Sequence, residues 1–343
     1  MTIMSKVAKN SPIPNWQQEL SAAYSNPAEL LAYLGLHVDD MSLFHEAAEK
    51  FPLLVTHSYA QRMKKSSWSD PLLRQVLPHP DELLSSPAYL SDPVGDGLAS
   101  VSPGLLHKYH GRALLIATGA CAIHCRYCFR REFPYSNNSA NRSQLTSIKQ
   151  YLAANNEINE IILSGGDPLT LGDSKFSHLF DALSNIEQIE RIRIHTRLPI
   201  VLPSRINTLL LSTLRASNKK VVMVIHANHA NELSDEVADV LLKLKDHGVT
   251  LLNQTVLLKG INDDLDSLEQ LSLRLFNCHT LPYYLHVLDK VAGAMHFDKN
   301  EEDSLKLYEK LQQRLPGYLV PKLVREESGK PYKTLLAHSP QNH

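Results

Sequence analysis

The 343-residue sequence lacks the features that mark several classes of protein. Its 35 basic and 36 acidic residues give a formal net charge of −1, so no basic field exists to hold nucleic acid or an anionic membrane. Its longest apolar runs, such as residues 221–225, are far shorter than the roughly 20 residues that cross a bilayer. The N-terminus has no continuous apolar stretch typical of a secretory signal. We therefore expect a cytoplasmic protein that binds neither nucleic acid nor membrane.

Cysteine is scarce, and so are the glycine motifs of nucleotide-binding folds. Four cysteines in a chain of this length do not indicate a disulfide scaffold. No Gly-rich dinucleotide fingerprint follows the first predicted strand, which argues against a Rossmann domain. A content of 43% hydrophobic and 21% charged residues is ordinary for a globular protein.

The hydrophobic pattern changes near Arg112. Before it, helical patterns are broken by Pro and Ser, and no strand-like alternation appears. After it, six short apolar segments are each followed by a helical pattern, which predicts a parallel α/β sheet. We expect strands near 112–118, 160–165, 191–196, 219–226, 249–258 and 281–288, with helices near 143–155, 175–186, 204–216, 232–247, 264–276 and 302–314.

Six units predict a partial (β/α)6 barrel rather than a full eight-stranded one. In such a fold the chemistry collects at the C-terminal ends of the strands. We divide the chain into a helical N-terminal region (1–105), a barrel core (106–315) and a short C-terminal segment (316–343). This last segment is expected to add one more strand and a charged loop that lies against the core.

Three of the four cysteines fall within eight positions, directly after the first predicted strand: Cys121, Cys125 and Cys128. Thiolates bind iron–sulfur clusters, and three of them leave one iron of a four-iron cluster open to a substrate or cofactor. A zinc site with His124 or Cys278 as fourth ligand is the alternative. Structural zinc usually needs a second pair of cysteines, which is absent here. We favour the cluster, and we expect Cys278 to be a small core residue.

The spacing CxxxCxxC after the first strand resembles the signature of the radical S-adenosylmethionine superfamily. The end of the second strand, Ser164, Gly165, Gly166 and Asp167, resembles the "GGE" motif of the same superfamily, with Asp in place of Glu. Glycines allow a ligand to approach the backbone closely. The resemblance implies a [4Fe-4S] cluster on the three cysteines, with the methionine ammonium of S-adenosylmethionine held at this turn.

From about Lys108 to Lys333 the sequence is similar to the lysine 2,3-aminomutases. The stretches that carry the similarity are CAIHCRYCFRR, SGGDPL, RLPIVLPSRI, VIHANH, LLNQTVLLKGIND and LPYYLHVLD. That family adds pyridoxal 5'-phosphate to the cluster and S-adenosylmethionine, and it shifts an amino group between adjacent carbons. The similarity implies an isomerase that acts on lysine and takes an electron from an external donor.

Pyridoxal phosphate needs a lysine to carry it, and two are candidates in the C-terminal segment. Lys330 lies in the Gly-rich step that the family's lysine occupies. The family also has an acidic residue seven positions before its lysine, and Glu326 precedes Lys333 by seven. We therefore predict Lys333 as the catalytic lysine.

The resemblance also assigns roles to other residues. Lys108, Tyr109 and Arg112 would hold the phosphate. Lys108 replaces an Arg of the family, and a Lys cannot make the bidentate contact of a guanidinium. Arg130 would pair with the substrate α-carboxylate. His226 and Gln254 match positions that contact S-adenosylmethionine. Asp289 and Glu326 match the two aspartates that hold the ε-ammonium of lysine, with Glu326 the longer carboxylate.

Glu326 and the early end of the chain after Lys333 resemble the shorter aminomutases that make (R)-β-lysine for elongation factor P. In that system a partner ligase attaches the product. An aminomutase that acts mainly on free lysine or on another amino acid for metabolism is the alternative within the class, although Asp289 favours a cationic side chain. A non-catalytic iron–sulfur protein is the alternative outside it, and it leaves the lysines and arginines unexplained.

Overall fold

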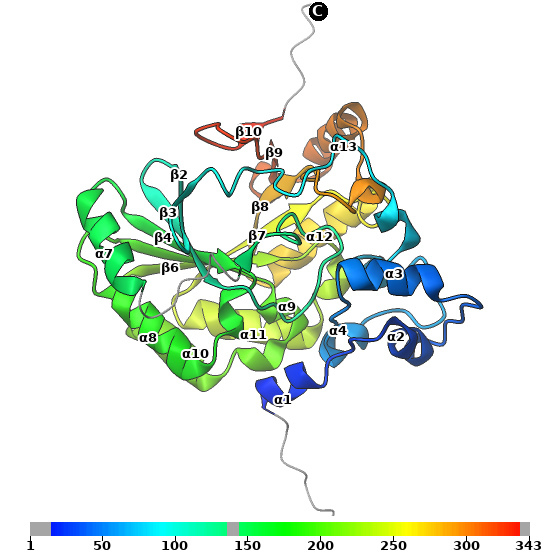
Figure 1. Cartoon of the computed structure of the whole chain (residues 1–343), viewed down its shortest axis with the longest axis horizontal. Coiled ribbons are helices and arrows are strands. Elements are labelled where there is room, and N and C mark those ends of the chain that lie inside the picture. The colour runs from blue at the N-terminus through cyan, green and yellow to red at the C-terminus, as the bar shows by residue number, and fades with distance from the viewer. Residues whose placement is uncertain (1–14, 136–143, 337–343) are drawn as a thin grey trace, which may run out of the picture.

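The computed structural model describes residues 15–135 and 144–336, and a curved sheet of ten strands forms its centre (Figure 1). The strands lie side by side in chain order, β1 to β10. Those from β3 to β9 run parallel, whereas β1, β2 and β10 pair in antiparallel fashion at the two edges. The strands are β1 (Ser100–Ser102), β2 (Leu105–Tyr109), β3 (Arg112–Thr118), β4 (Glu160–Gly165), β5 (Arg191–Thr196), β6 (Lys220–His226), β7 (Thr250–Val256), β8 (Leu281–His286), β9 (Lys322–Arg325) and β10 (Thr334–Leu335).

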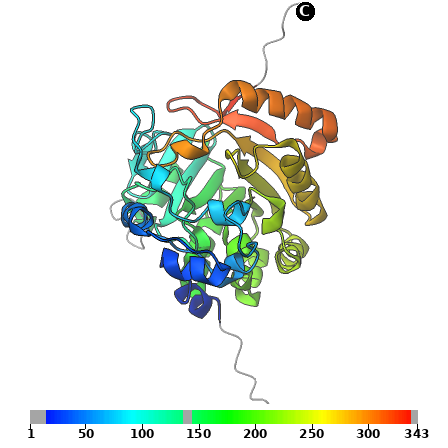
Figure 2. The ribbon, with the colours of Figure 1, turned by 90° about the vertical axis from the view of Figure 1, so that its right-hand side faces the viewer.

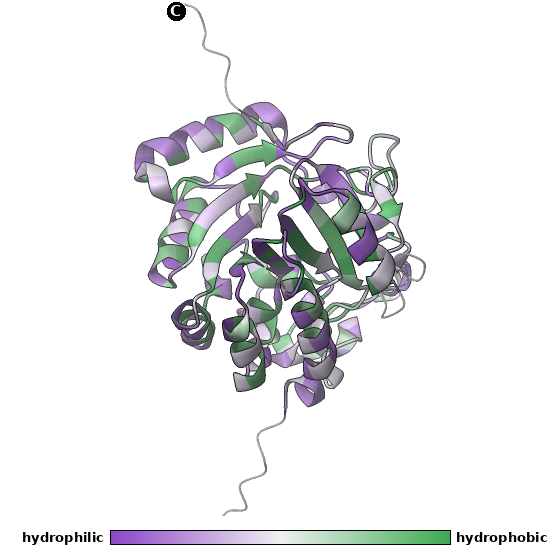
Figure 3. Cartoon of the chain, turned by 90° about the vertical axis from the view of Figure 1, so that its left-hand side faces the viewer, coloured by the Kyte–Doolittle hydropathy of each residue, from purple (hydrophilic) through white to green (hydrophobic). Residues whose placement is uncertain are grey.

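A helix of at least nine residues follows each of the strands β3 to β8 and covers the outer face of the sheet (Figure 2). These helices are amphipathic, and in Figure 3 they alternate between hydrophilic (purple) and hydrophobic (green) residues. Several strands, in contrast, are hydrophobic over most of their length. Helix α11, for example, is capped by the Ser234 side chain and buries Val237, Leu241 and Leu244. The six helices are α7 (Leu145–Ala154), α8 (Asp173–Ser184), α10 (Thr208–Ala216), α11 (Asp235–Asp246), α12 (Leu265–Asn277) and α13 (Glu301–Arg314).

The partial (β/α)6 barrel predicted from the sequence is confirmed: all six strand–helix units are present, and the seventh parallel strand is β9. The hairpin of β1 and β2 was not predicted. Its first strand has only three residues, and the turn between the strands uses Gly104 at a φ of 82°. Such a short pair carries too few residues to show an alternating pattern.

Short helices precede the sheet and pack against the segments that follow β5 and β6, where Arg62 donates to the carbonyls of Ile200 and Glu232. Leu30, Leu34 and Leu72 in them belong to the same hydrophobic core as the strands. Arg74 also donates a hydrogen bond of 2.7 Å to the carbonyl of Gly260. These helices are α1 (Trp16–Ser21), α2 (Pro27–Leu34), α3 (Ser42–Lys50), α4 (His57–Ala60) and α5 (Pro71–Arg74). Among the described residues, no helix is long and apolar enough to cross a membrane.

Candidate active site

The C-terminal ends of the parallel strands place many of the predicted site residues at one edge of the sheet, whereas Lys108, Tyr109 and Arg112 lie where β2 ends and β3 begins. The three cysteines follow β3, the Gly pair ends β4, and Asp289 follows β8. His226 is the last residue of β6 and pairs in register with Gln254 of β7. This edge is where α/β barrels carry their chemistry.

The cysteine loop is held rigidly against the N-terminal helices. The backbone N–H groups of His124 and Arg126 donate to the carbonyls of Leu54 (3.0 Å) and Gln75 (2.9 Å). The Arg126 side chain is fully buried and donates to both oxygens of Glu82, at 2.8 and 2.6 Å. Backbone hydrogen bonds and the buried Arg126 therefore fix the loop. Cys121, Cys125 and Cys128 are free thiols and form no disulfide.

The three thiols lie close enough to affect one another. Burial raises the pKa of the Cys128 thiol to about 11, and the neighbouring Cys125 adds to the effect. Burial and the nearby Cys128 also raise the pKa of Cys121 well above its usual value. Thiols that share a buried site in this way are stabilised as thiolates by bound cationic iron, so the donor set fits an iron–sulfur cluster.

The described residues contain no group of three or more His, Cys, Asp or Glu side chains placed to hold a single metal ion. In a four-iron cluster each cysteine binds a different iron, so three thiolates need not converge on one point. The two residues considered as a fourth zinc ligand lie otherwise engaged. The His124 ring contacts the Pro52 carbonyl at 2.8 Å, and Cys278 is buried at the end of α12.

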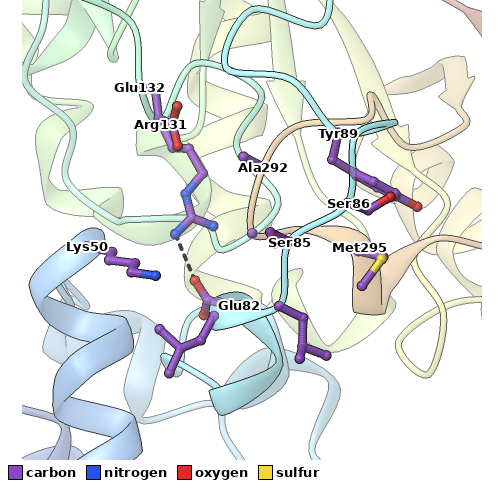
Figure 4. Close-up of a pocket in the computed structure, with 12 residues that line it drawn as sticks. Lys50, Glu82, Ser85, Ser86, Tyr89, Arg131, Glu132, Ala292 and Met295 are labelled. Carbon is purple, nitrogen blue, oxygen red and sulfur yellow. Dashed lines mark hydrogen bonds and ion pairs between the residues drawn. The ribbon is translucent and has the colours of Figure 1, made fainter.

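A small cavity of about 170 Å³ is lined by Arg131 and Glu132, which follow the cysteine loop in the chain (Figure 4). Arg131 projects toward Glu82 there and donates to its Oε2 at 2.8 Å. Glu82 thus accepts from Arg126 and Arg131 together, and this shared carboxylate fixes both ends of the segment that carries Cys128.

The glycine turn after β4 packs directly on the cysteine loop. Gly165 has a φ of 118°, and a Cβ on Gly166 would lie 2.3 Å from the carbonyl oxygen of Ala120. Only glycine fits at these two positions. The Asp167 carboxylate is already engaged: it accepts from the Thr196 hydroxyl at 2.7 Å and from the Arg197 N–H at 2.6 Å. In this structure Asp167 therefore joins the ends of β4 and β5.

A second cluster of charges surrounds the residues predicted to bind substrate. Arg130 donates to Asp96 (2.6 Å) and to the Ser164 hydroxyl (3.0 Å). Lys108 lies 2.7 Å from the other oxygen of Asp96 and 3.3 Å from Glu326. Asp96 is 2% exposed and was missed from the sequence, because it lies in a loop without periodic pattern. It links Arg130 to Lys108.

The two candidate lysines lie in different environments. Lys333 is partly buried and forms an ion pair with Glu326, and its ammonium lies 6.0 Å from the centre of the Tyr284 ring. Lys330 is exposed in the turn between β9 and β10. Lys108 and Lys333 lower the pKa of Glu326 to about 2, although burial alone would raise it. Of the two, Lys333 faces the charged cluster.

Asp289 and Glu326 both line a cavity of about 910 Å³. Burial raises the pKa of Asp289 to about 7, with Glu326 adding to the rise and Lys333 opposing it. A cationic side chain that enters this cavity can therefore meet the carboxyl groups of Asp289 and Glu326.

The inner face of the sheet carries further polar side chains, and two of them, Arg193 and His195, were not predicted from the sequence. Along β5, Ile192 and Ile194 are buried, while Arg193 and His195 are half-buried on the opposite side. Arg193 pairs with Glu160 at 2.8 Å. Burial lowers the pKa of His195 well below its usual value and that of His226 to about 3, so both rings are neutral.

The phosphate residues predicted from the sequence also lie on this side. The guanidinium of Arg112 lies 4.6 Å from the centre of the Tyr109 ring. Arg112 and Arg193 both face Tyr284, since each lowers the pKa of that phenol, which burial raises. Two arginines and a tyrosine on one inner surface form a cradle suited to a phosphate.

Arg197 is the other functional candidate that the sequence did not reveal. It begins helix α9 (Leu198–Val201) at the end of β5, and its guanidinium is almost completely buried. It donates to Cys125 Sγ at 2.7 Å and to Glu232 Oε2 at 2.8 Å. Its signals in the sequence were its place at a strand end and its position at the start of the stretch RLPIVLPSRI.

Comparison with known proteins agrees with this geometry. Residues 115–271 match the model of the Radical SAM superfamily. The protein named L-lysine 2,3-aminomutase of Escherichia coli K12 is 45% identical over 96% of this chain and 97% of its own length. That of Haemophilus influenzae is 44% identical over 94% and 96%. The Clostridium subterminale protein of the same name is 30% identical over 93% of this chain and 77% of its own length.

Proposed function

Because the chain belongs to the lysine 2,3-aminomutase family of the radical S-adenosylmethionine superfamily, we propose that it converts L-lysine to β-lysine. Enzymes of this family are isomerases whose cofactors are a [4Fe-4S] cluster, S-adenosylmethionine and pyridoxal 5'-phosphate. When bound, these groups supply the radical that takes a hydrogen atom from the substrate and the π-system that stabilises the migrating nitrogen.

We assign the cofactors to the residues that fit them. Cys121, Cys125 and Cys128 would hold the cluster, whose fourth iron stays open. S-adenosylmethionine would bind beside the turn from Ser164 to Gly166, whose glycines pack against the cysteine loop, and beside the paired residues His226 and Gln254. Asp167 acts by holding this turn, since its oxygens are bonded to Thr196 and Arg197. Lys333 would carry pyridoxal phosphate, and Tyr109, Arg112 and Lys108 would face its phosphate.

One observation above all supports lysine as the substrate. Around Lys333, a basic side chain and a pair of acidic side chains are available to opposite ends of a ligand. Arg130, held by Asp96 and Ser164, offers a guanidinium to an α-carboxylate. Asp289 and Glu326, which line one cavity, offer carboxylates to an ε-ammonium. A substrate with a carboxylate at one end and an ammonium at the other matches this arrangement, whereas glutamate would place like charges together.

The buried surroundings of the site also suit a radical reaction. A reactive radical attacks any nearby group, so water and solvent-exposed side chains must be excluded. The ion pair of Lys108 with Glu326 joins β2 to the β9–β10 hairpin. Burial lowers the pKa of His226 to about 3, so this ring is neutral.

We infer further that the product is (R)-β-lysine made in the cytoplasm for elongation factor P. The support is the longer carboxylate at Glu326, which matches the short aminomutases of that pathway. Lysine then binds as the free amino acid, a ligase attaches the product, and an external donor reduces the cluster. A role in free-lysine metabolism predicts the same first reaction but no dependence of elongation factor P on this chain.

The test is to incubate the reconstituted protein with L-lysine, S-adenosylmethionine and dithionite and to resolve the β-lysine enantiomers. We expect β-lysine, mostly the R form. Formation of the S form would contradict the link to elongation factor P, and the absence of any β-lysine with a fully loaded protein would contradict the proposed reaction.

A further inference from the structure

We infer that Arg197 is a positioning residue that sets the reduction potential of the cluster through its hydrogen bond to Cys125. The inference rests on the proposed function, because it requires a cluster on the three cysteines. It concerns the residues around that cluster rather than its ligands.

The guanidinium of Arg197 is fixed from several sides. One nitrogen, Nη1, donates to Cys125 Sγ at 2.7 Å and to the Tyr127 hydroxyl at 2.8 Å. The other, Nη2, donates to Glu232 Oε2 at 2.8 Å and to Gln75 Oε1 at 2.7 Å. The backbone N–H of Arg197 donates to Asp167 as well. Arg197 therefore cannot turn away from the cysteine loop without losing a buried network.

The partners keep Arg197 charged. Glu232 is completely buried, and its second oxygen accepts from the N–H groups of Asn228 (2.9 Å) and His229 (3.1 Å). The ion pair of 2.8 Å with Glu232 holds the guanidinium of Arg197 as a cation, since Arg is always charged in proteins.

A cation that donates to a ligand thiolate favours the reduced cluster. Reduction adds one electron from the external donor to the cluster, so the negative charge on its iron, sulfide and thiolate atoms increases. Hydrogen bonds to the sulfurs and nearby positive charge stabilise that added charge and raise the potential. The effect is strong here because the pair is buried, where charges are poorly screened. Glu232 acts in the opposite sense, since its negative charge partly cancels that of Arg197.

The ion pair therefore predicts two shifts of opposite sign. Arg197→Gln should lower the ratio of reduced to oxidised cluster at least tenfold at a fixed potential, which for one electron corresponds to about 59 mV. Glu232→Gln should raise the same ratio. Loss of packing in the network would move both variants in the same direction, so the sign separates an electrostatic role from a structural one.

The experiment is a redox titration of the reconstituted cluster without S-adenosylmethionine, followed by its electron paramagnetic resonance signal, with iron content measured in parallel. Arg205→Gln is the matched control: Arg205 is as buried as Arg197 and also paired with a carboxylate, but its bonds go to Asp173, Leu169 and Leu171. It should leave the potential of the cluster unchanged.

The possible outcomes separate the inference about Arg197 from the proposed function. Opposite shifts in the two variants support the inference, and shifts of the same sign, or none, overturn it. If Arg197→Gln fails to hold iron, Glu232→Gln decides alone: a higher ratio supports the inference, and an unchanged or lower one overturns it. A wild-type protein that assembles no four-iron cluster would instead overturn the proposed function, and the inference with it.

Discussion

Replacing Asp289 by Asn tests how the site recognises the far end of its substrate. Asp289 lines the cavity together with Glu326, and Glu326 is already paired with Lys333 and Lys108. Asp289 is therefore the carboxylate left to meet an ε-ammonium. Losing one partner of a buried charge pair costs roughly 3–5 kcal/mol. Since Glu326 remains nearby, we expect the lower end, about 3 kcal/mol, or a roughly 150-fold weaker affinity for lysine.

The assay is a titration of the pyridoxal phosphate-loaded protein, in which lysine binding changes the absorbance of the bound cofactor. Norleucine, which has the shape of lysine without the ε-nitrogen, is the matched control ligand. Asp289→Asn should weaken lysine and leave norleucine, iron content and cofactor content unchanged. Equal losses for the two ligands, or no loss for lysine, would show that Asp289 does not face the ammonium.

The same carboxylate predicts a dependence on pH. Burial holds the pKa of Asp289 at about 7, far above its ordinary value, so the free protein has a neutral carboxyl below pH 7. Lysine must then displace a proton, and its affinity should fall about tenfold for each pH unit below 7 and level off above it. Asp289→Asn should abolish this slope. A wild-type affinity that stays constant from pH 5.5 to 7 would contradict the role of burial at Asp289.

Three further predictions concern the cluster, the cofactor lysine and stability. Cys125→Ala should remove most bound iron after anaerobic reconstitution, while Cys278→Ala, a change in the core at the end of α12, should retain it; equal iron in both would contradict the ligand assignment. Borohydride reduction of the cofactor-loaded protein should place the pyridoxyl mass on the peptide of Lys333 and not on exposed Lys330, as peptide mapping would show. Finally, Lys333 and Lys108 lower the pKa of Glu326 to about 2, although burial alone would raise it. The ionised Glu326 therefore stabilises the fold fully above pH 4.5, its ordinary pKa, and this stabilisation is lost as the pH falls toward 2. Chemical denaturation of the cofactor-free protein should show a smaller loss of stability over that range in Glu326→Gln.

The elements that follow simple periodic patterns were predictable from the sequence. Segments such as RALLIAT and RIRIHT are apolar, strand-sized and followed by amphipathic helices, and they form β3 and β5. The cysteine loop could be singled out for a different reason, because its three cysteines fall within eight positions of the chain. The β1–β2 hairpin was not, since a three-residue strand at a sheet edge shows no alternation.

The contacts that hold the site were harder to foresee because they join residues far apart in the chain. Asp96 reaches Arg130 and Lys108, and Arg197 reaches Cys125 and Glu232. A single Asp or Arg in a loop gives no sign of such partners until the fold brings them together. Asp167 is the opposite case. Its motif indicated a contact with a ligand, whereas in the structure its carboxylate accepts hydrogen bonds from Thr196 and Arg197 and so joins the ends of β4 and β5.

The central claim is that this chain moves the α-nitrogen of lysine to the neighbouring carbon. The most direct measurement follows L-lysine labelled with ¹⁵N at C2 and with ¹³C at C2 and C3, in the presence of the loaded protein, S-adenosylmethionine and dithionite. Nuclear magnetic resonance should show the ¹⁵N bonded to C3 in the product, and no such product should form without S-adenosylmethionine. A ¹⁵N label that remains on C2, or is released as ammonia, would contradict the account.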